Sequence, residues 1–281
     1  MMNLSVLGVY REAEFSPGKV EDDAAIIDAV LAELKRNGAV VAALSPEEFI
    51  TTSLRHADVV LAMCQSHRAL SRLAEVEKTG AVVMNTALAI RNCYRDLLGI
   101  GLMRAGVPVP EGSLVSTAMP LDPKPLRSLD LTAPLYVKRG DLHALGPDDV
   151  NRVEGFDQLE AALTDLATRG VSAAYVQQEA PGEVVKFYGV SGSHYFAAMT
   201  ERGTLAEAQI APLQKAAATA AEALGLEVWG GDAIFHGNQF AIVDFNDWPS
   251  FGRVRGEAAR AIARRSLQLV GRQSAARDLL A

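Results

Sequence analysis

The 281-residue chain has the composition of an ordinary globular protein, with 49% hydrophobic and 22% charged residues. This composition excludes a disordered or fibrous protein. Lys and Arg number 27 against 34 Asp and Glu, which gives a net charge of −7. Such a balance argues against nucleic acid as a partner, because sequence-independent binding of that kind needs a basic face.

The two cysteines, Cys64 and Cys93, stand outside any metal-type spacing and could form at most one disulfide. A reducing, cytoplasmic setting is therefore expected. The N-terminus lacks the charged segment of a secretory signal, and no stretch approaches 18 uncharged apolar residues, so neither export nor a membrane partner is expected. The sequence leaves the oligomeric state open, a homo-oligomer included.

The first 84 residues alternate short apolar runs with helical patterns, as in a parallel sheet covered by helices. Apolar residues at helical spacing predict a helix over 22–36, which Asn37 and Gly38 end. A second helix is predicted over 67–78. The strands of this part are predicted at 4–10, 39–43, 57–63 and 81–84. We expect an N-terminal α/β lobe at 1–84.

The next region mixes helices and strands. A single helix is predicted over 87–105, and the segment GVPVPEG at 106–112 then breaks regular structure. Strands at 135–138 and 174–178 enclose a predicted helix at 157–169. We expect this initial helix and a central lobe to occupy 85–178.

Two hairpins characterise the remainder of the chain. Strands at 184–190 and 194–199 flank Ser191-Gly192-Ser193, and strands at 230–235 and 240–246 form the second pair. Helices are predicted at 205–224 and 257–269. These elements predict a C-terminal lobe at 179–281.

The last hairpin places polar residues inside apolar strands. Asp244 and Asn246 are two residues apart, so a strand points both to one face, and Ile242 is expected on that face as well. Three oxygen ligands, with Asp232 from the facing strand, suit a hard cation such as Mg²⁺. The alternative is a hairpin whose acidic residues are simply solvated.

The pairing of these two strands decides whether Asp232 lies opposite Asp244. It does so if His236 faces Phe240 through a three-residue loop, or if a β-bulge shifts the register. Two carboxylates brought together in this way repel each other unless a cation lies between them.

Two lysines lie in predicted strands. Lys138 and Lys186 are each surrounded by apolar residues, and an unpaired lysine is costly to bury, so each should reach water or an anion such as phosphate. Taken singly, either could be an edge residue on a solvated face. The extended segment 175–183 could present backbone groups to a base or serve only as a linker between lobes.

Other familiar motifs are absent. No GxxxxGK[ST] run occurs, and Gly99-Ile100-Gly101 lies within a helical pattern and does not follow a strand. The five histidines lack the spacing of a zinc site, so each is interpreted as a surface or core residue. These histidines are His56, His67, His143, His194 and His236.

The order of these segments resembles the ATP-grasp superfamily over nearly the whole chain, first the RimK-like carboxylate–amine ligases and second the inositol polyphosphate kinases. The resemblance implies an α/β fold in which a parallel N-terminal lobe precedes two lobes that clamp ATP. It assigns ATP contacts to Arg95, Lys138, Gln178, Glu179, Glu183 and Lys186. The implied catalytic residues are Lys186, Arg202 and Arg253, and the implied metal ligands are Asp232, Asp244 and Asn246.

Three departures separate the chain from the ligase pattern. Asp244 replaces the usual Glu, and its Asp-x-Asn pattern is similar to that of the inositol kinases. The lid segment at 139–146 is short of glycine, and Phe251-Gly252 stands where Pro-Gly is common. Arg202, Arg253 and Arg255 could also be solvated loop charges.

The resemblance implies a ligase that joins a small-molecule or peptide carboxylate to an amine through an acylphosphate, using ATP and Mg²⁺, with Mn²⁺ as a substitute. One alternative is a small-molecule kinase, in which a hydroxyl accepts the phosphoryl group. The other is a nucleotide-binding protein without turnover. The acceptor and the amine are not encoded in any readable motif.

Overall fold

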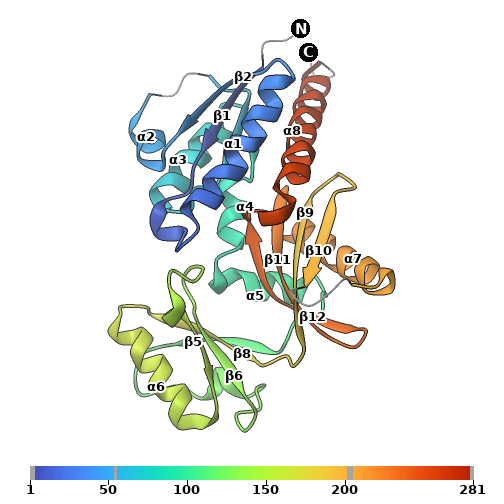
Figure 1. Cartoon of the computed structure of the whole chain (residues 1–281). Coiled ribbons are helices and arrows are strands. Elements are labelled where there is room, and N and C mark those ends of the chain that lie inside the picture. Colours follow the sequence, from blue (N-terminus) through green and yellow to red (C-terminus); the bar gives the residue numbers. More distant parts are fainter. Residues whose placement is uncertain (1–3, 54–55, 201–204, 279–281) are drawn as a thin grey trace.

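The computed structural model describes residues 4–53, 56–200 and 205–278. Three four-stranded sheets follow one another along the chain, and the long helix at the end of the chain returns to the first of them (Figure 1). The first sheet is parallel, whereas the second and third are antiparallel. No helix in the described ranges combines the length and apolarity that a membrane span requires.

The first sheet has the strand order β2-β1-β3-β4. Its alternate residues enter two apolar cores: Val59 and Leu61 face α1 and the C-terminal helix, whereas Val60 and Ala62 face α2 and α3. The strands are β1 (Ser5–Val9), β2 (Val40–Leu44), β3 (Val59–Ala62) and β4 (Val82–Met84), and the helices are α1 (Val20–Arg36), α2 (Pro46–Thr51) and α3 (His67–Glu77). The predicted parallel arrangement is confirmed, although the short α2 was not predicted.

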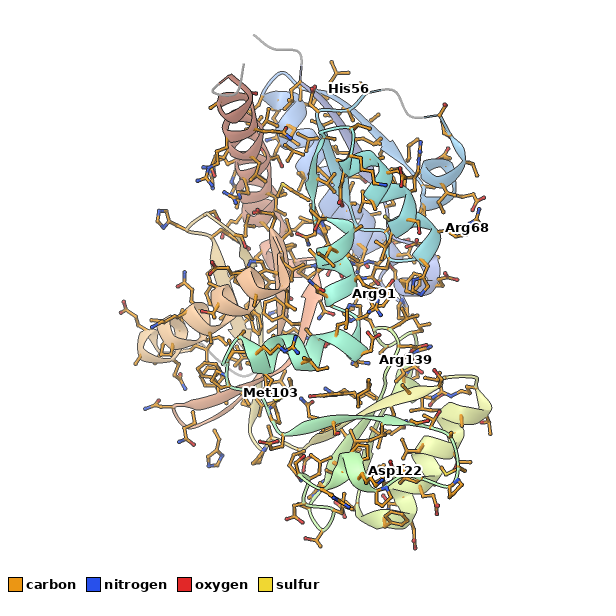
Figure 2. The ribbon with its side chains drawn as sticks, turned by 180° about the vertical axis from the view of Figure 1, so that it is seen from behind. His56, Arg68, Arg91, Met103, Asp122 and Arg139 are labelled. Carbon is orange, nitrogen blue, oxygen red and sulfur yellow. The ribbon has the colours of Figure 1, made fainter. Side chains whose placement is uncertain are left out.

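The helix predicted over 87–105 is wrong as a single element, because the chain forms α4 (Ala87–Asn92) and α5 (Arg95–Arg104). Figure 2 labels Arg91 on α4 and Met103 on α5. Tyr94 interrupts it with an extended backbone, and its buried ring packs into the core under the first sheet. Its hydroxyl donates to the Gln65 carbonyl. This break makes Arg95 the first residue of α5.

The second sheet has the order β5-β8-β6-β7, and α6 (Gly155–Thr168) buries its apolar face against it. The strands are β5 (Gly112–Ser116), β6 (Leu135–Arg139), β7 (Val150–Val153) and β8 (Ala173–Gln178). The two edge strands, β5 and β7, were not predicted. Both are short and carry polar residues, so they lack the apolar run that marks the inner strands.

The third sheet has the order β10-β9-β11-β12, and α7 (Glu207–Leu224) covers one face. The strands are β9 (Glu183–Val190), β10 (Phe196–Thr200), β11 (Val228–His236) and β12 (Gln239–Asp247). Helix α8 (Arg255–Asp278) leaves this sheet and packs beside α1. Short 3₁₀ turns lie at Ala13–Phe15, Lys124–Leu126, Pro147–Asp149 and Gly252–Val254.

A β-bulge sets the register of β11 and β12. His236 pairs with Gln239 around a two-residue turn, so the expected pairing with Phe240 is wrong. The register shifts between Asp232 and Ala233, which leaves Val243 as the extra residue and puts Asp232 opposite Asp244. The bulge was one of the two arrangements that the sequence allowed.

The bulge also changes which residues share a face. Ile242 and Phe245 both pack into the core beneath α7. Ile242 therefore does not lie on the face of Asp244, contrary to the expectation from strict alternation. The extra residue reverses the alternation and sends Asp244 and Asn246 to the face opposite α7.

A buried asparagine connects the first and third sheets. Asn85 follows β4 and is fully buried. Its Nδ2 donates to the Val228 carbonyl at 2.7 Å, and its Oδ1 accepts from the backbone N–H groups of Glu227 and Val228 at 2.7 and 2.9 Å. The start of β11 is thus fixed to the end of β4. The lobe boundaries expected at 84/85 and 178/179 stay a prediction.

Candidate functional site

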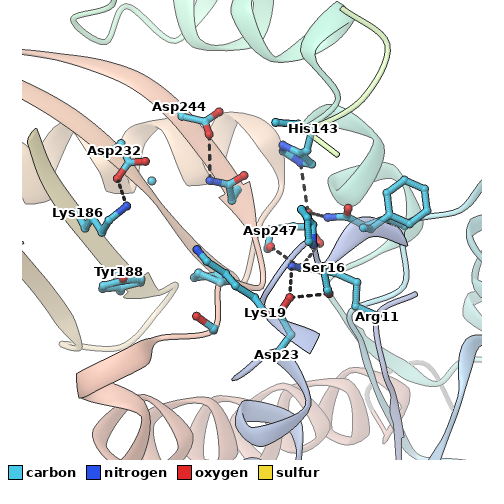
Figure 3. A pocket seen from close by; sticks show the side chains of 18 of the residues that line it. Arg11, Ser16, Lys19, Asp23, His143, Lys186, Tyr188, Asp232, Asp244 and Asp247 are labelled. Carbon is cyan, nitrogen blue, oxygen red and sulfur yellow. Dashed lines mark hydrogen bonds and ion pairs between the residues drawn. The ribbon is translucent and has the colours of Figure 1, made fainter. Parts of the chain in front are cut away.

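A cleft of about 320 Å³ opens over the face of the third sheet that α7 leaves uncovered (Figure 3). All three parts of the chain line it. The third sheet contributes Lys186, Tyr188, Asp232, Asp244 and Asn246. The segment after β1 and the start of α1 contribute Arg11, Ser16, Lys19 and Asp23, and the loop after β6 contributes His143. A cavity built at such a junction is a usual place for a ligand.

A row of charged side chains crosses the floor of this cleft. The registers place Lys186 opposite Asp232, and Asp232 opposite Asp244. The Lys186 Nζ atom lies 3.1 Å from Asp232 Oδ1, and Asn246 Nδ2 donates to Asp244 Oδ2 at 3.4 Å. The structure therefore brings the three predicted metal ligands together on one face, beside a lysine.

The two carboxyl groups have opposite pKa shifts. Burial raises the pKa of Asp232, and the nearby Asp244 adds to this, against the opposing charge of Lys186. Burial also acts to raise the pKa of Asp244, but the charges of Arg95 and Lys138 outweigh it, and the net shift is downward. The charges of Arg95 and Lys138 thus favour the ionised form of Asp244. Burial disfavours the ionised form of Asp232, and the charge of Lys186 acts against that effect.

The donor set fits a divalent oxygen-seeking cation. The Oδ1 atom of Asp244 is buried and has no hydrogen-bond partner among the described residues, and its nearest cation, Arg95 Nη2, is 4.0 Å away. No three Asp, Glu, His or Cys side chains in the described ranges form a metal cluster. An ion here would rest on two carboxylates, the Asn246 amide and oxygens from water or a ligand, as Mg²⁺ commonly does.

Lys138 lines a small cavity that adjoins the cleft, since Arg95 and Asp244 line both. Its side chain is 7% exposed, and Nζ donates to Gln177 Oε1 at 2.7 Å and to the Val243 carbonyl at 3.0 Å. Burial lowers the pKa of Lys138 to about 8, although Asp244 acts in the opposite direction. A phosphate oxygen nearby would favour its charged form.

Gln178 and Glu179 have their side chains engaged outside the cleft. Gln178 accepts from the Asp130 backbone N–H at 3.1 Å and donates to the Pro134 carbonyl at 3.0 Å. Glu179 forms an ion pair with Arg152 at 2.7 Å. Their backbone N–H groups are also in use, because Gln178 donates to the Glu111 carbonyl at 2.8 Å and Glu179 to the Pro134 carbonyl at 3.0 Å. Neither N–H group is therefore free to contact a base, as the sequence had suggested for backbone groups of this segment.

The remaining predicted residues also stay apart from the floor of the cleft. Glu183 accepts a hydrogen bond from the Thr200 hydroxyl at the edge of the third sheet. Arg253 is exposed on the last 3₁₀ turn, and Arg255 forms an ion pair with Asp22 at 2.6 Å. The described lining of both cavities includes neither Glu183 nor Arg253. Arg202 lies outside the described residues.

Several residues in the cleft were not predicted as site residues. His143 was interpreted as a surface or core residue, yet it lines the cleft and its Nε2 atom lies 3.8 Å from Asp247 Oδ1. Neither of its ring nitrogens has a hydrogen-bond partner in the described part of the chain. Its place in the predicted lid segment was the available signal. Arg11 and Asp247 carried no such signal.

Comparison with protein-family models finds no match, and no curated protein matches in sequence. Solved structures do match. A D-alanine–D-alanine ligase from Coxiella burnetii is 14% identical, with a TM-score of 0.76 over 99% of this chain and 98% of the other. The ATP-complexed D-alanine–D-alanine ligase from Bacillus anthracis is 13% identical, with a TM-score of 0.73 over 97% and 100%.

A RimK-domain ATP-grasp protein from Sphaerobacter thermophilus is 18% identical, with a TM-score of 0.68 over 93% of this chain and 99% of the other. The similarity to these structures thus extends over nearly the full length of each pair. Identities this low establish a shared fold and leave the activity to be argued from the site.

Proposed function

Since the chain has the ATP-grasp fold, with the predicted likeness to a RimK-domain protein, we propose that it is an ATP- and Mg²⁺-dependent ligase that joins a carboxylate to an amine. The proposal rests mainly on the row of Lys186, Asp232 and Asp244 across the cleft floor. Lys138 lies in the adjoining cavity and donates to the Val243 carbonyl. The carboxylate would belong to a small molecule or a peptide. The ligase names of the structural neighbours support this class of reaction.

The proposed reaction has two steps. An oxygen of the substrate carboxylate attacks the γ-phosphorus of ATP, the bond to the bridging oxygen breaks, and ADP and an acylphosphate result. An amine then attacks the acyl carbon, phosphate leaves, and the amine loses a proton as the amide forms. The protein's task is to position the reactants and to balance phosphate charge, which is where most of the catalysis of phosphoryl transfer arises.

The cleft residues have separate roles in this proposal. Lys138 and Lys186 would contact phosphate oxygens, and Arg95 would approach the same group from the start of α5. Asp232, Asp244 and Asn246 would hold Mg²⁺, which when bound neutralises charge on the transferred phosphoryl group; Mn²⁺ could replace it. When the phosphates arrive, Lys186 would exchange its contact with Asp232 for one with ATP, which leaves Asp232 to the cation.

Backbone carbonyl groups of Gln178 and Glu179 would contact the base, and Glu183 the ribose. Arg202 and Arg253 are proposed to approach the transferred phosphate or an anionic substrate. The two cysteines are free and buried. We therefore propose a reducing, cytoplasmic setting for the protein, which the free thiols support.

One observation favours a second candidate, a small-molecule kinase. Asp244 and Asn246 form the Asp-x-Asn pattern that resembles the inositol kinases, whereas the ligase group usually has Glu at the first position. In that reaction a hydroxyl accepts the phosphoryl group and no amine is needed. If the shorter Asp has removed activity, the chain binds nucleotide without turnover.

Calorimetric titration with ATP, with and without Mg²⁺, tests the site. Asp244→Asn should remove the Mg²⁺-dependent part of the affinity, and Lys138→Ala should weaken ATP binding at every Mg²⁺ concentration. Asp165→Asn, on the exposed face of α6, is the matched control and should leave binding unchanged. If Mg²⁺-dependent ATP binding survives both site variants, the assignment of the site is wrong.

Mass spectrometry of the products separates the three functions. The protein is incubated with ATP, Mg²⁺ and a metabolite extract depleted of amines, in the presence and absence of added amines. A ligase forms an amide, with ADP and phosphate, only when an amine is present. A phosphate ester that accumulates without amine indicates the kinase, because a ligase forms an acylphosphate and no ester. Tight ATP binding without ADP indicates the third alternative.

A further inference from the structure

We propose that Arg11 is a positioning residue that fixes the end of β12 and thereby sets the affinity of the site for the divalent cation. The inference rests on the proposed function, because it concerns the residues assigned to Mg²⁺. Arg11 lies two residues after the end of β1, whereas Asp244 and Asn246 belong to the third sheet. The constraint therefore passes from one sheet to another.

Most N–H groups of the Arg11 guanidinium donate to protein groups. Its Nη2 donates to the carbonyls of Asp247 and Trp248 at 3.1 and 2.8 Å. Its Nε donates to the Met63 carbonyl at 3.2 Å, and its Nη1 donates to Asp23 Oδ2 at 3.2 Å. Four of the five N–H groups of an arginine are thus in use, and the side chain is only 10% exposed. This leaves little capacity to grip a substrate.

The two carbonyl contacts fall next to the predicted ligands. Asp247 follows Asn246 directly, and Trp248 is the next residue. Both bonds can form together only when the last residues of β12 lie where the structure has them. Such support around ligands determines how well they meet a metal ion, and its loss commonly lowers metal affinity by tenfold to a hundredfold.

Arg11 also supplies a positive charge beside two buried carboxylates, those of Asp23 and Asp247. Asp23 Oδ2 accepts from Arg11 and from the Ser16 hydroxyl, the latter at 2.8 Å. Asp247 is fully buried, its Oδ1 accepts from Gln65 Nε2 at 2.8 Å, and its Oδ2 lies 3.9 Å from Arg11 Nη2. Loss of the charge would leave both carboxylates uncompensated, so a neutral variant tests stability more than position.

Arg11→Lys separates position from charge. Lysine keeps the positive charge, but its ammonium lacks the planar fork that reaches two carbonyls and a carboxylate at once. We expect the variant to fold and to bind ATP alone as the native protein does. The Mg²⁺ concentration that half-saturates ATP binding should rise by about tenfold or more.

The matched control is Arg265→Lys. Arg265 is 8% exposed and forms hydrogen bonds to both carboxylate oxygens of Glu227, at 2.7 and 3.0 Å, away from the cleft. The same exchange there should leave the Mg²⁺ dependence unchanged. Amide hydrogen exchange of the nucleotide-free full chain gives a readout besides affinity: peptides covering 243–248 should exchange faster in Arg11→Lys and not in Arg265→Lys.

Each outcome decides the inference. It is overturned if Arg11→Lys shows native Mg²⁺ dependence and native exchange, or if it weakens ATP binding equally with and without Mg²⁺, because Arg11 would then contact nucleotide itself.

A second variant is available if Arg11→Lys does not fold. Asp23→Asn removes the carboxylate that orients Nη1 of Arg11, and it should also raise the Mg²⁺ concentration that half-saturates ATP binding. Native dependence in that variant also overturns the inference. Failure of the proposed function would appear separately, as a native protein without Mg²⁺-dependent ATP binding, and the inference would fail with it.

Discussion

The ammonium nitrogen of Lys138, on the second sheet, donates a hydrogen bond to the carbonyl of Val243, on the third, across 3.0 Å. Val243 is the extra residue of the β-bulge and has no partner in the ladder with β11. The bulge therefore provides an acceptor for the lysine and turns Asp244 toward the cleft. One local irregularity in β12 joins the two sides of the proposed phosphate site.

The lowered pKa of Lys138 predicts that ATP affinity depends on pH. Burial brings the pKa to about 8, and Asp244, Asp232 and Arg95 are the charged groups that also act on it. Lys138 loses its charge as the pH rises through this value, so a phosphate contact is lost. The dissociation constant for MgATP should be nearly constant below about pH 7 and should rise by about fivefold between pH 8 and 9. Calorimetry at fixed free Mg²⁺ measures it.

Lys138→Arg is the control for this pH profile, since a guanidinium stays charged throughout the range. Its affinity, whatever its absolute value, should be flat between pH 7 and 9. A fall of equal size in both proteins would assign the effect to another group.

Lys186→Met should weaken MgATP binding by about tenfold, the loss of one charged contact to phosphate. The side chain is 51% exposed, so little effect on stability is expected. Burial already raises the pKa of Asp232, and removal of the Lys186 charge should raise that pKa further. The MgATP affinity of the variant should therefore fall more steeply than that of the native protein as the pH is lowered. Lys215→Met on the exposed side of α7 provides the comparison. Equal MgATP affinities in the two variants would show that Lys186 does not contact the phosphates.

Asn85→Ala should lower the free energy of unfolding by about 3 kcal/mol, because it leaves the N–H groups of Glu227 and Val228 without partners. It also leaves the Val228 carbonyl with only the longer bond from the Trp248 N–H, at 3.4 Å. Asn92→Ala removes one half-buried hydrogen bond, to the Leu224 carbonyl, and should cost about 1 kcal/mol. Urea denaturation followed by circular dichroism measures both. Similar losses in the two variants would contradict the bridging role of Asn85.

Gly231→Ala should displace β12 and reduce MgATP affinity. A Cβ atom at Gly231 would lie 2.3 Å from the Asp244 carbonyl oxygen and 2.6 Å from the Phe187 ring, and neither can yield cheaply. Such overpacking costs about 2 kcal/mol of stability. Gly237→Asn is the control, because the turn has φ +61° and open space, which asparagine tolerates. Native affinity in Gly231→Ala would show that the ligands do not depend on this spacing.

Much of the architecture followed from local patterns. Apolar periodicity placed the strands of the first sheet and the helices α1 and α3 within a few residues, because each has an apolar face that packs against the core. The spacing of Asp244 and Asn246 also fixed that both lie on one side of a strand. The edge strands β5 and β7 were not predicted, because a strand at a half-solvated edge of a sheet needs no apolar run.

The amino-acid sequence by itself determined the order of the inner strands and the long helices, and the polar residues of the last hairpin, since both depend on neighbours along the chain. The tertiary structure alone decided that the helix breaks at Tyr94, where an aromatic ring is buried under the first sheet. It alone chose the bulge at Val243 over a longer loop. It also brought Arg11 to a carbonyl 236 residues away, because guanidinium and carbonyl meet only when separate sheets have packed.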